Sequence, residues 1–99
     1  MSNIFKPDTL CVQGGWSPKK GEPRVLPIYQ STTYKYDTAK EVAQLFDLEA
    51  SGHMYSRISN PTCEALEHKI ATLEGGVGAL VTASGQNASM IAITNICSS

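Results

Sequence analysis

Two groups of residues in the second half of the chain have the types and spacing to bind a phosphate. Tyr55 and Arg57 lie two positions apart in an otherwise uncharged loop. The arginine fork matches phosphate geometry, and a tyrosine hydroxyl adds a neutral donor. Gly85 and Gln86 follow Ser84 at the expected start of a helix, where free backbone N–H groups and the helix dipole favour an anion. Glycine lets a ligand approach the backbone closely, so the sequence predicts a phosphate site made from two segments.

Each half of this predicted site also has a simpler structural explanation. A surface arginine beside a packed tyrosine gives the same pattern, and exposed ion contacts carry little energy. Small residues where a strand meets a helix often serve the turn itself. Gly76 and Gly78 stand before and at the start of an apolar run rather than after it, which favours a helix stop over a dinucleotide-binding loop. His53 and His68 have no cysteine or carboxylate at metal-ligand or triad spacing, so we expect neither a metal site nor a catalytic base.

Residues 1–60 are expected to form an arm with one short helix. The first 37 residues carry four of the five prolines and show no sustained period of 2 or 3.6. Thr38 is expected to cap a helix that runs to about Ala50, with Gly52 as its stop. Irregular segments of this length are uncommon inside compact domains. We therefore expect the arm to pack on another chain, such as a neighbouring subunit.

Residues 61–99 predict a helix, a strand and a second helix. Pro61 suits the first position of a helix that Asn60 caps. The apolar run 77–83 is long enough for a buried strand and too short for a helix, and helical composition resumes from 86 to 97. This order is typical of a layered α/β domain whose strand is covered on both faces. The other strands of such a sheet are not expected in this chain.

The composition indicates one small globular domain and excludes several classes of partner. The 99 residues are 41% hydrophobic and 17% charged, with a net charge of -1. Basic and acidic residues are balanced without runs, so we expect no nucleic-acid or anionic membrane partner. No signal peptide or membrane span is visible, which favours a cytoplasmic location. Cys11, Cys63 and Cys97 lack metal or redox spacing, and we expect free, buried thiols in a reducing compartment.

Three motifs in order resemble the Cys/Met-metabolism family of pyridoxal-phosphate-dependent enzymes. They are YSRISNPT at 55–62, LEGG at 73–76 and SGQ at 84–86. The stretches VLPIYQSTTY at 25–34 and LFDL at 45–48 are most similar to the O-acetylhomoserine sulfhydrylase branch of this family. The resemblance runs from about Thr9 to the last residue, and the three motifs at family spacing make it specific.

The resemblance implies a fold-type I, aspartate-aminotransferase-like α/β architecture with pyridoxal 5'-phosphate as cofactor. This chain would hold the amino-terminal arm and the start of the large cofactor-binding domain, with an incomplete sheet. Family members are usually homotetramers, dimers of dimers with active sites at subunit interfaces. By that likeness Gly85 and Gln86 would donate backbone N–H groups to the cofactor phosphate of their own subunit. Tyr55 and Arg57 would reach the phosphate of the neighbouring subunit.

Two positions depart from the common family pattern, and both leave this assignment in place. Gln13-Gly14-Gly15 stands where many relatives carry His-Ala-Gly. Gln86 stands where others often have methionine, and it still offers a backbone donor.

The catalytic groups that the resemblance implies are expected beyond Ser99. None of the six lysines matches the family position of the lysine that forms the Schiff base, so we assign no catalytic residue and expect the chain alone to be inactive. The implied reaction is γ-replacement, which makes L-homocysteine from O-acetyl-L-homoserine and sulfide. Cystathionine γ-synthase and methionine γ-lyase are the alternatives within the family. Alternatives of another class are a non-catalytic truncated subunit that lends its arm to a full-length partner and a stand-alone phosphate-binding module.

Overall fold

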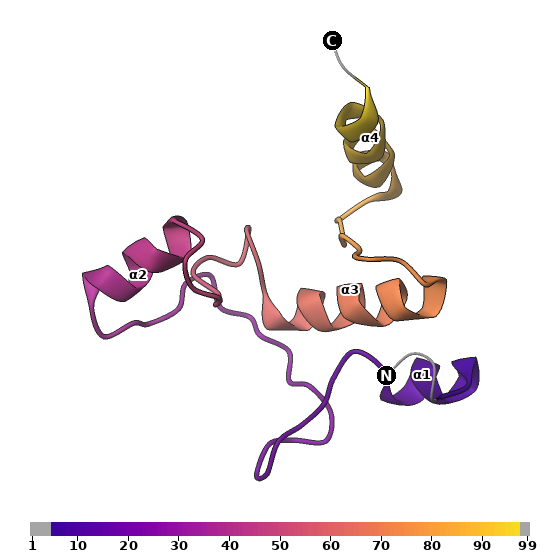
Figure 1. Cartoon of the computed structure of the whole chain (residues 1–99), viewed down its shortest axis with the longest axis horizontal. Coiled ribbons are helices and arrows are strands. Elements are labelled where there is room, and N and C mark those ends of the chain that lie inside the picture. Colours follow the sequence, from indigo (N-terminus) through magenta and orange to yellow (C-terminus); the bar gives the residue numbers. More distant parts are fainter. Residues whose placement is uncertain (1–4, 98–99) are drawn as a thin grey trace.

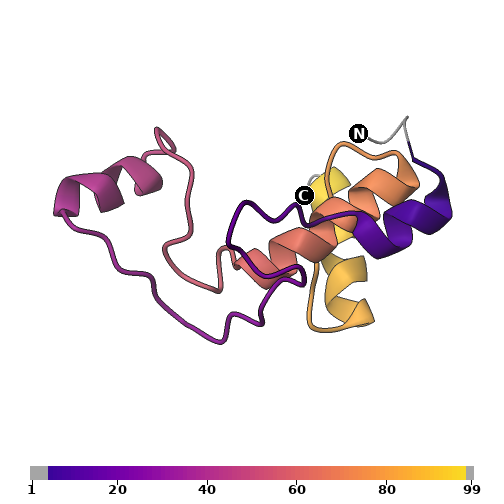
Figure 2. The same ribbon diagram turned by 90° about the horizontal axis from the view of Figure 1, so that it is seen from below.

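The computed structural model describes residues 5–97, and these contain four helices. The helices are α1 (Pro7–Gln13), α2 (Ala39–Phe46), α3 (Pro61–Glu74) and α4 (Gly85–Ile96). In Figure 1, α1 lies beside α3, α2 projects to one side on long loops, and α4 leads towards the carboxyl terminus. Figure 2 shows the same arrangement from below, with α1 along α3 and α2 standing apart.

The described chain has little hydrophobic core of its own. Within residues 5–97, Leu10 and Leu45 are the only buried hydrophobic side chains, at 8% and 4% exposure. The radius of gyration is 15.9 Å, against about 13 Å for a compact domain of this length. The helices are therefore defined mainly by caps and hydrogen bonds. In the same part of the chain, no helix combines the length and apolar character that crossing a membrane requires.

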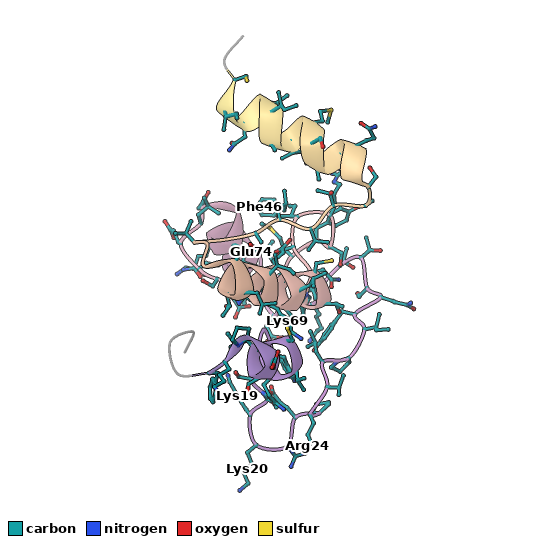
Figure 3. The ribbon with its side chains drawn as sticks, turned by 90° about the vertical axis from the view of Figure 1, so that its right-hand side faces the viewer. Lys19, Lys20, Arg24, Phe46, Lys69 and Glu74 are labelled. Carbon is teal, nitrogen blue, oxygen red and sulfur yellow. The ribbon has the colours of Figure 1, made fainter. Side chains whose placement is uncertain are left out.

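The sequence predicts one helix before residue 60, and the structure has two. The additional helix, α1, starts with Pro7 and packs against α3. Lys69 of α3 lies beside α1, as Figure 3 shows, and its Nζ donates a hydrogen bond to the carbonyl oxygen of Cys11 at 2.9 Å. Gly15 has φ +83°, and a Cβ there would lie 2.3 Å from the carbonyl oxygen of Ala65. The prediction of a fully irregular start is wrong because contacts with α3 stabilise a helix too short to show periodicity.

Helix α2 begins where the sequence predicts and ends earlier. Thr38 caps it through a capping box: its side chain accepts a backbone N–H from the first turn, and a glutamate there accepts the N–H of Thr38. The helix ends at Phe46, so the predicted extension to Ala50 is wrong. The chain turns away at Leu48, whose φ of 59° is left-handed. Gly52 does not stop the helix; a Cβ there would lie 2.9 Å from the hydroxyl of Tyr36.

The limits of α3 and α4 are close to those predicted. Asn60 caps α3 by accepting the N–H of Thr62 at 2.9 Å, and Gly75 ends the helix with a left-handed φ of 68°. Ser84 caps α4, which starts at Gly85, one residue before the predicted start. Local capping signals therefore define both helices.

The segment 77–83 is the main departure from the predicted secondary structure. We expected a buried strand, but residues 5–97 contain no β-strand and only one isolated antiparallel bridge, between Thr33 and Tyr55. Val77 and Leu80 are exposed. A strand needs a neighbour for its hydrogen bonds, and the described residues supply none. The apolar run therefore indicates a segment that tends to be buried, but no segment among the described residues covers it.

Candidate functional site

Arg57 and Tyr55 form a cation–aromatic pair in the loop between α2 and α3. The guanidinium carbon lies 5.4 Å from the centre of the tyrosine ring, a distance at which the ring attracts a cation. Arg57 is exposed, Tyr55 is partly buried, and no ion pair within the described part of the chain uses Arg57. The tyrosine ring therefore supports the guanidinium, and the N–H donors of Arg57 stay available to an anion.

Asn60 is a buried polar side chain that fixes this loop to residues 29–34, an earlier segment of the arm. It is 8% exposed, and its amide nitrogen lies 3.0 Å from the carbonyl oxygen of Tyr29, 3.2 Å from the Tyr34 hydroxyl and 3.1 Å from Ser56 Oγ. Its amide oxygen accepts the N–H of Thr62. The amide has two N–H donors, so the three acceptors share them. The sequence predicts the cap, but not these contacts with the arm.

Two further hydroxyl-bearing residues complete the contact between the arm and the loop. Thr62 Oγ1 accepts the N–H of Tyr29 at 3.0 Å and donates to the carbonyl oxygen of Pro27 at 3.1 Å. The N–H of Ser56 donates to the carbonyl oxygen of Thr32 at 2.9 Å. We call these contacts of residues 27–34 with residues 55–62 the Asn60 junction. The junction therefore holds the chain both before Arg57, at Ser56, and after it, at Asn60 and Thr62.

Gly85 and Gln86 occupy the first two positions of α4, so both lie at the amino end of the helix, where a phosphate contact was predicted. Ser84 Oγ accepts the N–H of Asn87 at 3.2 Å, and the first amides of a helix have no partner within the helix. A Cβ built on Gly85 meets nothing within 4 Å, and the first turn of α4 holds no acidic residue. The position is therefore open to an anion, which fits the phosphate of the predicted cofactor.

In the described part of the chain, the two cavities that Arg57 lines do not reach the other half of the predicted site. Arg57 lines a cavity of about 680 Å³ beside α3, and Arg57 and Tyr55 line another of about 330 Å³; Gly85 and Gln86 line neither. In Figure 1, α4 stands clear of α3 and is joined to its carboxyl-terminal end by a loop, while the loop that carries Arg57 precedes the amino-terminal end of α3. Other cations, Lys19, Lys20 and Arg24, lie on the loop after α1, away from α4 (Figure 3). The assignment of the halves to different subunits stays a prediction.

Glu64 contacts both histidines, which the sequence did not lead us to expect. His53 Nε2 lies 2.9 Å from one carboxylate oxygen and His68 Nε2 lies 3.7 Å from the other. Helical spacing brings Glu64 beside His68, and the loop folds His53 onto the same residue. The spacing in the sequence did not predict these two contacts, because the one with His53 depends on the loop conformation. Within residues 5–97, no group of three or more His, Cys, Asp or Glu side chains is arranged to hold a metal ion.

The cysteines are free, as predicted, but they are not buried. Cys11, Cys63 and Cys97 are all exposed. The prediction of buried thiols assumed a packed core, and the three helices that carry or precede these residues bury little surface.

Comparison with known proteins identifies the family. Residues 8–99 match the family described as Cys/Met metabolism PLP-dependent enzyme. The O-acetyl-L-homoserine sulfhydrylase of Leptospira meyeri is 45% identical over 97 residues, which are 97% of this chain and 22% of that protein. The L-methionine gamma-lyase of Pseudomonas putida is 43% identical over 81 residues, 81% of this chain and 20% of that protein. The chain thus spans about a fifth of the length of these relatives.

A solved structure supports the predicted fold class. The chain superposes with a TM-score of 0.88 on a structure described as an O-acetylhomoserine (thiol)-lyase from Campylobacter jejuni, which contains N'-pyridoxyl-lysine-5'-monophosphate. The two are 36% identical, and the match covers 96% of this chain and 23% of that chain. The predicted α/β architecture, with a sheet that this chain does not complete, is thereby confirmed. The chain belongs to the Cys/Met metabolism family of enzymes that depend on pyridoxal phosphate.

Proposed function

We propose that this chain is the amino-terminal part of an O-acetylhomoserine sulfhydrylase, which makes L-homocysteine from O-acetyl-L-homoserine and sulfide. Similarity to a sulfhydrylase over 97% of the chain supports this choice of reaction. The observation that carries the proposal is the exposed Arg57 guanidinium, which rests on Tyr55 and has no acidic partner among the described residues. A fixed, unpaired guanidinium is suited to a dianionic phosphate.

The residues of this chain would bind and orient the cofactor. Gly85 and Gln86 would donate backbone N–H groups to the phosphate of their own subunit, and Tyr55 and Arg57 would bind that of the neighbouring subunit in a homo-oligomer. The separation of the two halves within one chain is compatible with this arrangement. When bound, pyridoxal phosphate supplies an electron sink for the γ-replacement of an amino-acid substrate. Proton transfers and the Schiff base are assigned to residues outside this chain.

The reaction can be tested by a steady-state assay of the full gene product. With O-acetylhomoserine and sulfide we expect homocysteine, and its absence would contradict the proposal. Methionine γ-lyase is the second candidate, because such an enzyme matches 81% of the chain. Release of a thiol from methionine, without homocysteine formation from O-acetylhomoserine, would favour that candidate. Cystathionine formed from cysteine in preference to sulfide would indicate cystathionine γ-synthase.

The role of Arg57 can be tested by measuring cofactor affinity. We expect Arg57→Ala to weaken the binding of pyridoxal 5'-phosphate to the full gene product by about tenfold or more, because a charge-assisted contact is lost. Arg57→Lys should recover part of the lost affinity, since a lysine keeps the positive charge but not the forked pair of donors of the guanidinium. Arg24→Ala is the matched control, because Arg24 lies on the loop after α1. Equal affinities of the Arg57→Ala and wild-type proteins would remove Arg57 from the site.

Mixing two defective proteins tests the assignment of the halves to different subunits. Arg57→Ala subunits and Gly85→Val subunits would each form defective sites when alone. A mixed dimer would contain one site with Gly85 and Arg57 both intact, so random mixing should restore about a quarter of the sites. No recovery after confirmed subunit exchange would show that both residues serve the same subunit's site.

A further inference from the structure

His53 lies between the loop that carries Arg57 and helix α3, and it is held on both ring nitrogens. Its Nδ1 lies 2.9 Å from Ser59 Oγ, and its Nε2 lies 2.9 Å from Glu64 Oε2. Its side chain is 25% exposed, so these contacts are partly shielded from water. The ring therefore joins the end of the loop to the first turns of the helix.

The same residue is held by two tyrosines of the arm. The hydroxyl of Tyr36 donates a hydrogen bond to the carbonyl oxygen of His53, and the ring of Tyr34 lies 5.8 Å from the imidazole, centre to centre. Tyr34 also belongs to the Asn60 junction. His53 is thus in contact with the arm, the loop and the helix at once.

The hydrogen-bond pattern suits one tautomer of the neutral ring. With a proton on Nε2, the ring donates to the Glu64 carboxylate, and Nδ1 accepts the hydroxyl hydrogen of Ser59. A doubly protonated ring keeps both contacts, since the serine oxygen then accepts. The link therefore persists in either charge state, and its role is one of geometry.

Arg57 lies inside the turn that this ring closes. The N–H groups of Ile58 and Ser59 both donate to the carbonyl oxygen of Tyr55, at 2.9 and 3.1 Å. His53 precedes this turn and bonds to its last residue, so the ring bridges its two ends. A change in the position of the turn would move the guanidinium directly.

We infer that His53, anchored by Glu64, is a positioning residue that sets where the Arg57 guanidinium meets the cofactor phosphate. This inference rests on the proposed function, because it takes Arg57 as a phosphate ligand. His53 itself touches no phosphate; it acts through the turn at 55–59. Removing it should weaken the binding of the phosphate group and leave the binding of the pyridine ring unchanged.

The experiment compares two probes on the full gene product: pyridoxal 5'-phosphate and pyridoxal, which lacks the phosphate. The measured quantity is the affinity for pyridoxal 5'-phosphate divided by the affinity for pyridoxal, both from spectroscopic titration. We expect His53→Ala and Glu64→Ala each to lower this ratio about fivefold, the effect of one lost hydrogen bond. Glu64→Gln keeps an acceptor for the ring and should retain the wild-type ratio. His68→Ala is the matched control, since His68 is 67% exposed and lies 3.7 Å from the same carboxylate.

A double variant distinguishes positioning from general damage to the fold. If His53 acts through Arg57, then His53→Ala should not change the ratio further once Arg57 is alanine. Equal loss of affinity for both probes would overturn the inference and leave His53 with a purely structural role. A normal ratio in His53→Ala would overturn it too, while the proposed function stands if Arg57→Ala lowers the ratio. If Arg57→Ala itself has no effect, the phosphate assignment fails and the inference falls with it.

Folding of each variant is checked by circular dichroism before titration. If His53→Ala does not fold, Glu64→Ala tests the same link from the helix side. His53→Gln, whose amide can still donate towards Glu64, should give a ratio between those of His53→Ala and the wild type. A ratio in His53→Gln below that of His53→Ala would contradict the proposed geometry.

Discussion

The Asn60 junction and the segment from residue 76 to the end of α4 are fixed in different ways. At the junction, the side chains of Asn60 and Thr62 bond to backbone groups of residues 27 and 29, about thirty positions away in sequence. In the carboxyl-terminal segment, Glu67 Oε1 accepts the N–H of Val81 at 3.0 Å, and no other side-chain hydrogen bond among the described residues ties 76–96 to an earlier element. The Ser84 cap defines the residue at which α4 begins, whereas the position of a helix in space is defined by contacts with residues distant in sequence.

This difference also separates the two halves of the proposed phosphate site. Arg57 is positioned by contacts that this chain supplies, whereas the amides of Gly85 and Gln86 depend on the position of α4. Ile93 and Met90 of α4 and Leu80 before it are exposed. Their burial would require contacts from outside the described residues. Four measurements test whether contacts within this chain fix the Asn60 junction while α4 depends on residues outside the described part.

The first measurement asks whether residues 1–99 fold when expressed alone. We expect no cooperative thermal unfolding, because two buried hydrophobic side chains among the described residues cannot offset the entropy of ordering the chain. The unpartnered apolar segment 77–83 should also promote aggregation. Circular dichroism during heating of purified monomer checks this. A sharp two-state transition would show that the junction is sufficient as a core.

The second measurement removes the centre of the junction. In the full gene product, Asn60→Ala should lower the free energy of unfolding by about 3 kcal/mol, since it removes a cap and the donors to three acceptors at the junction. Urea denaturation checks this value. Asn60→Asp is the informative control: it keeps an acceptor for the N–H of Thr62 and loses the donors to Tyr29, Tyr34 and Ser56. If Asn60→Asp were as stable as wild type, Asn60 would contribute to stability only as the cap of α3.

The third measurement compares Gly15, which lies against α3, with Gly85 at the start of α4. Gly15→Ala should cost about 2 kcal/mol, because φ is +83° and the new methyl group would collide with the backbone of α3. Gly85→Ala should leave stability unchanged or raise it by up to about 1 kcal/mol, because the space there is open. The same Gly85 substitution should weaken cofactor binding. Equal destabilisation by both substitutions would mean that α4 is packed as closely as α1.

The smallest effect is expected for the ion pair between Lys35 and Asp37. The two side chains are 89% and 82% exposed, at 3.3 Å, so solvent screens their attraction. Lys35→Ala should change the free energy of unfolding by less than about 0.5 kcal/mol. Urea denaturation at low and high salt checks this. A loss above about 1 kcal/mol would indicate that another chain covers this part of the arm.

Sequence patterns predicted the elements whose causes are local. Thr38, Asn60 and Ser84 each cap a helix through their own side chains, and Gly75 ends one by its left-handed conformation. Such signals act within a few residues, so the sequence shows them directly. The sequence likewise placed Arg57 in a loop and Gly85 close to a helix start, while their contacts with a phosphate stay a prediction.

The remaining features depend on residues far apart in the chain. The contacts of Asn60 with Tyr29 and of His53 with Glu64 could not be read from spacing, because the loop conformation brings them together. The predicted strand at 77–83 was wrong for the same reason, since a ladder needs a second segment. Helix α1 was missed because its stability comes from α3.

The hydrogen bond from Lys69 to Cys11 has a consequence for synthesis on the ribosome. Helix α1 has seven residues and no basic residue in its last turn, and a lysine 58 positions later in the chain supplies the cation. A helix this short is not stable by itself in water. Helix α1 leaves the ribosome before α3 and must therefore wait for α3 before it can persist, so its formation depends on a segment that is made later.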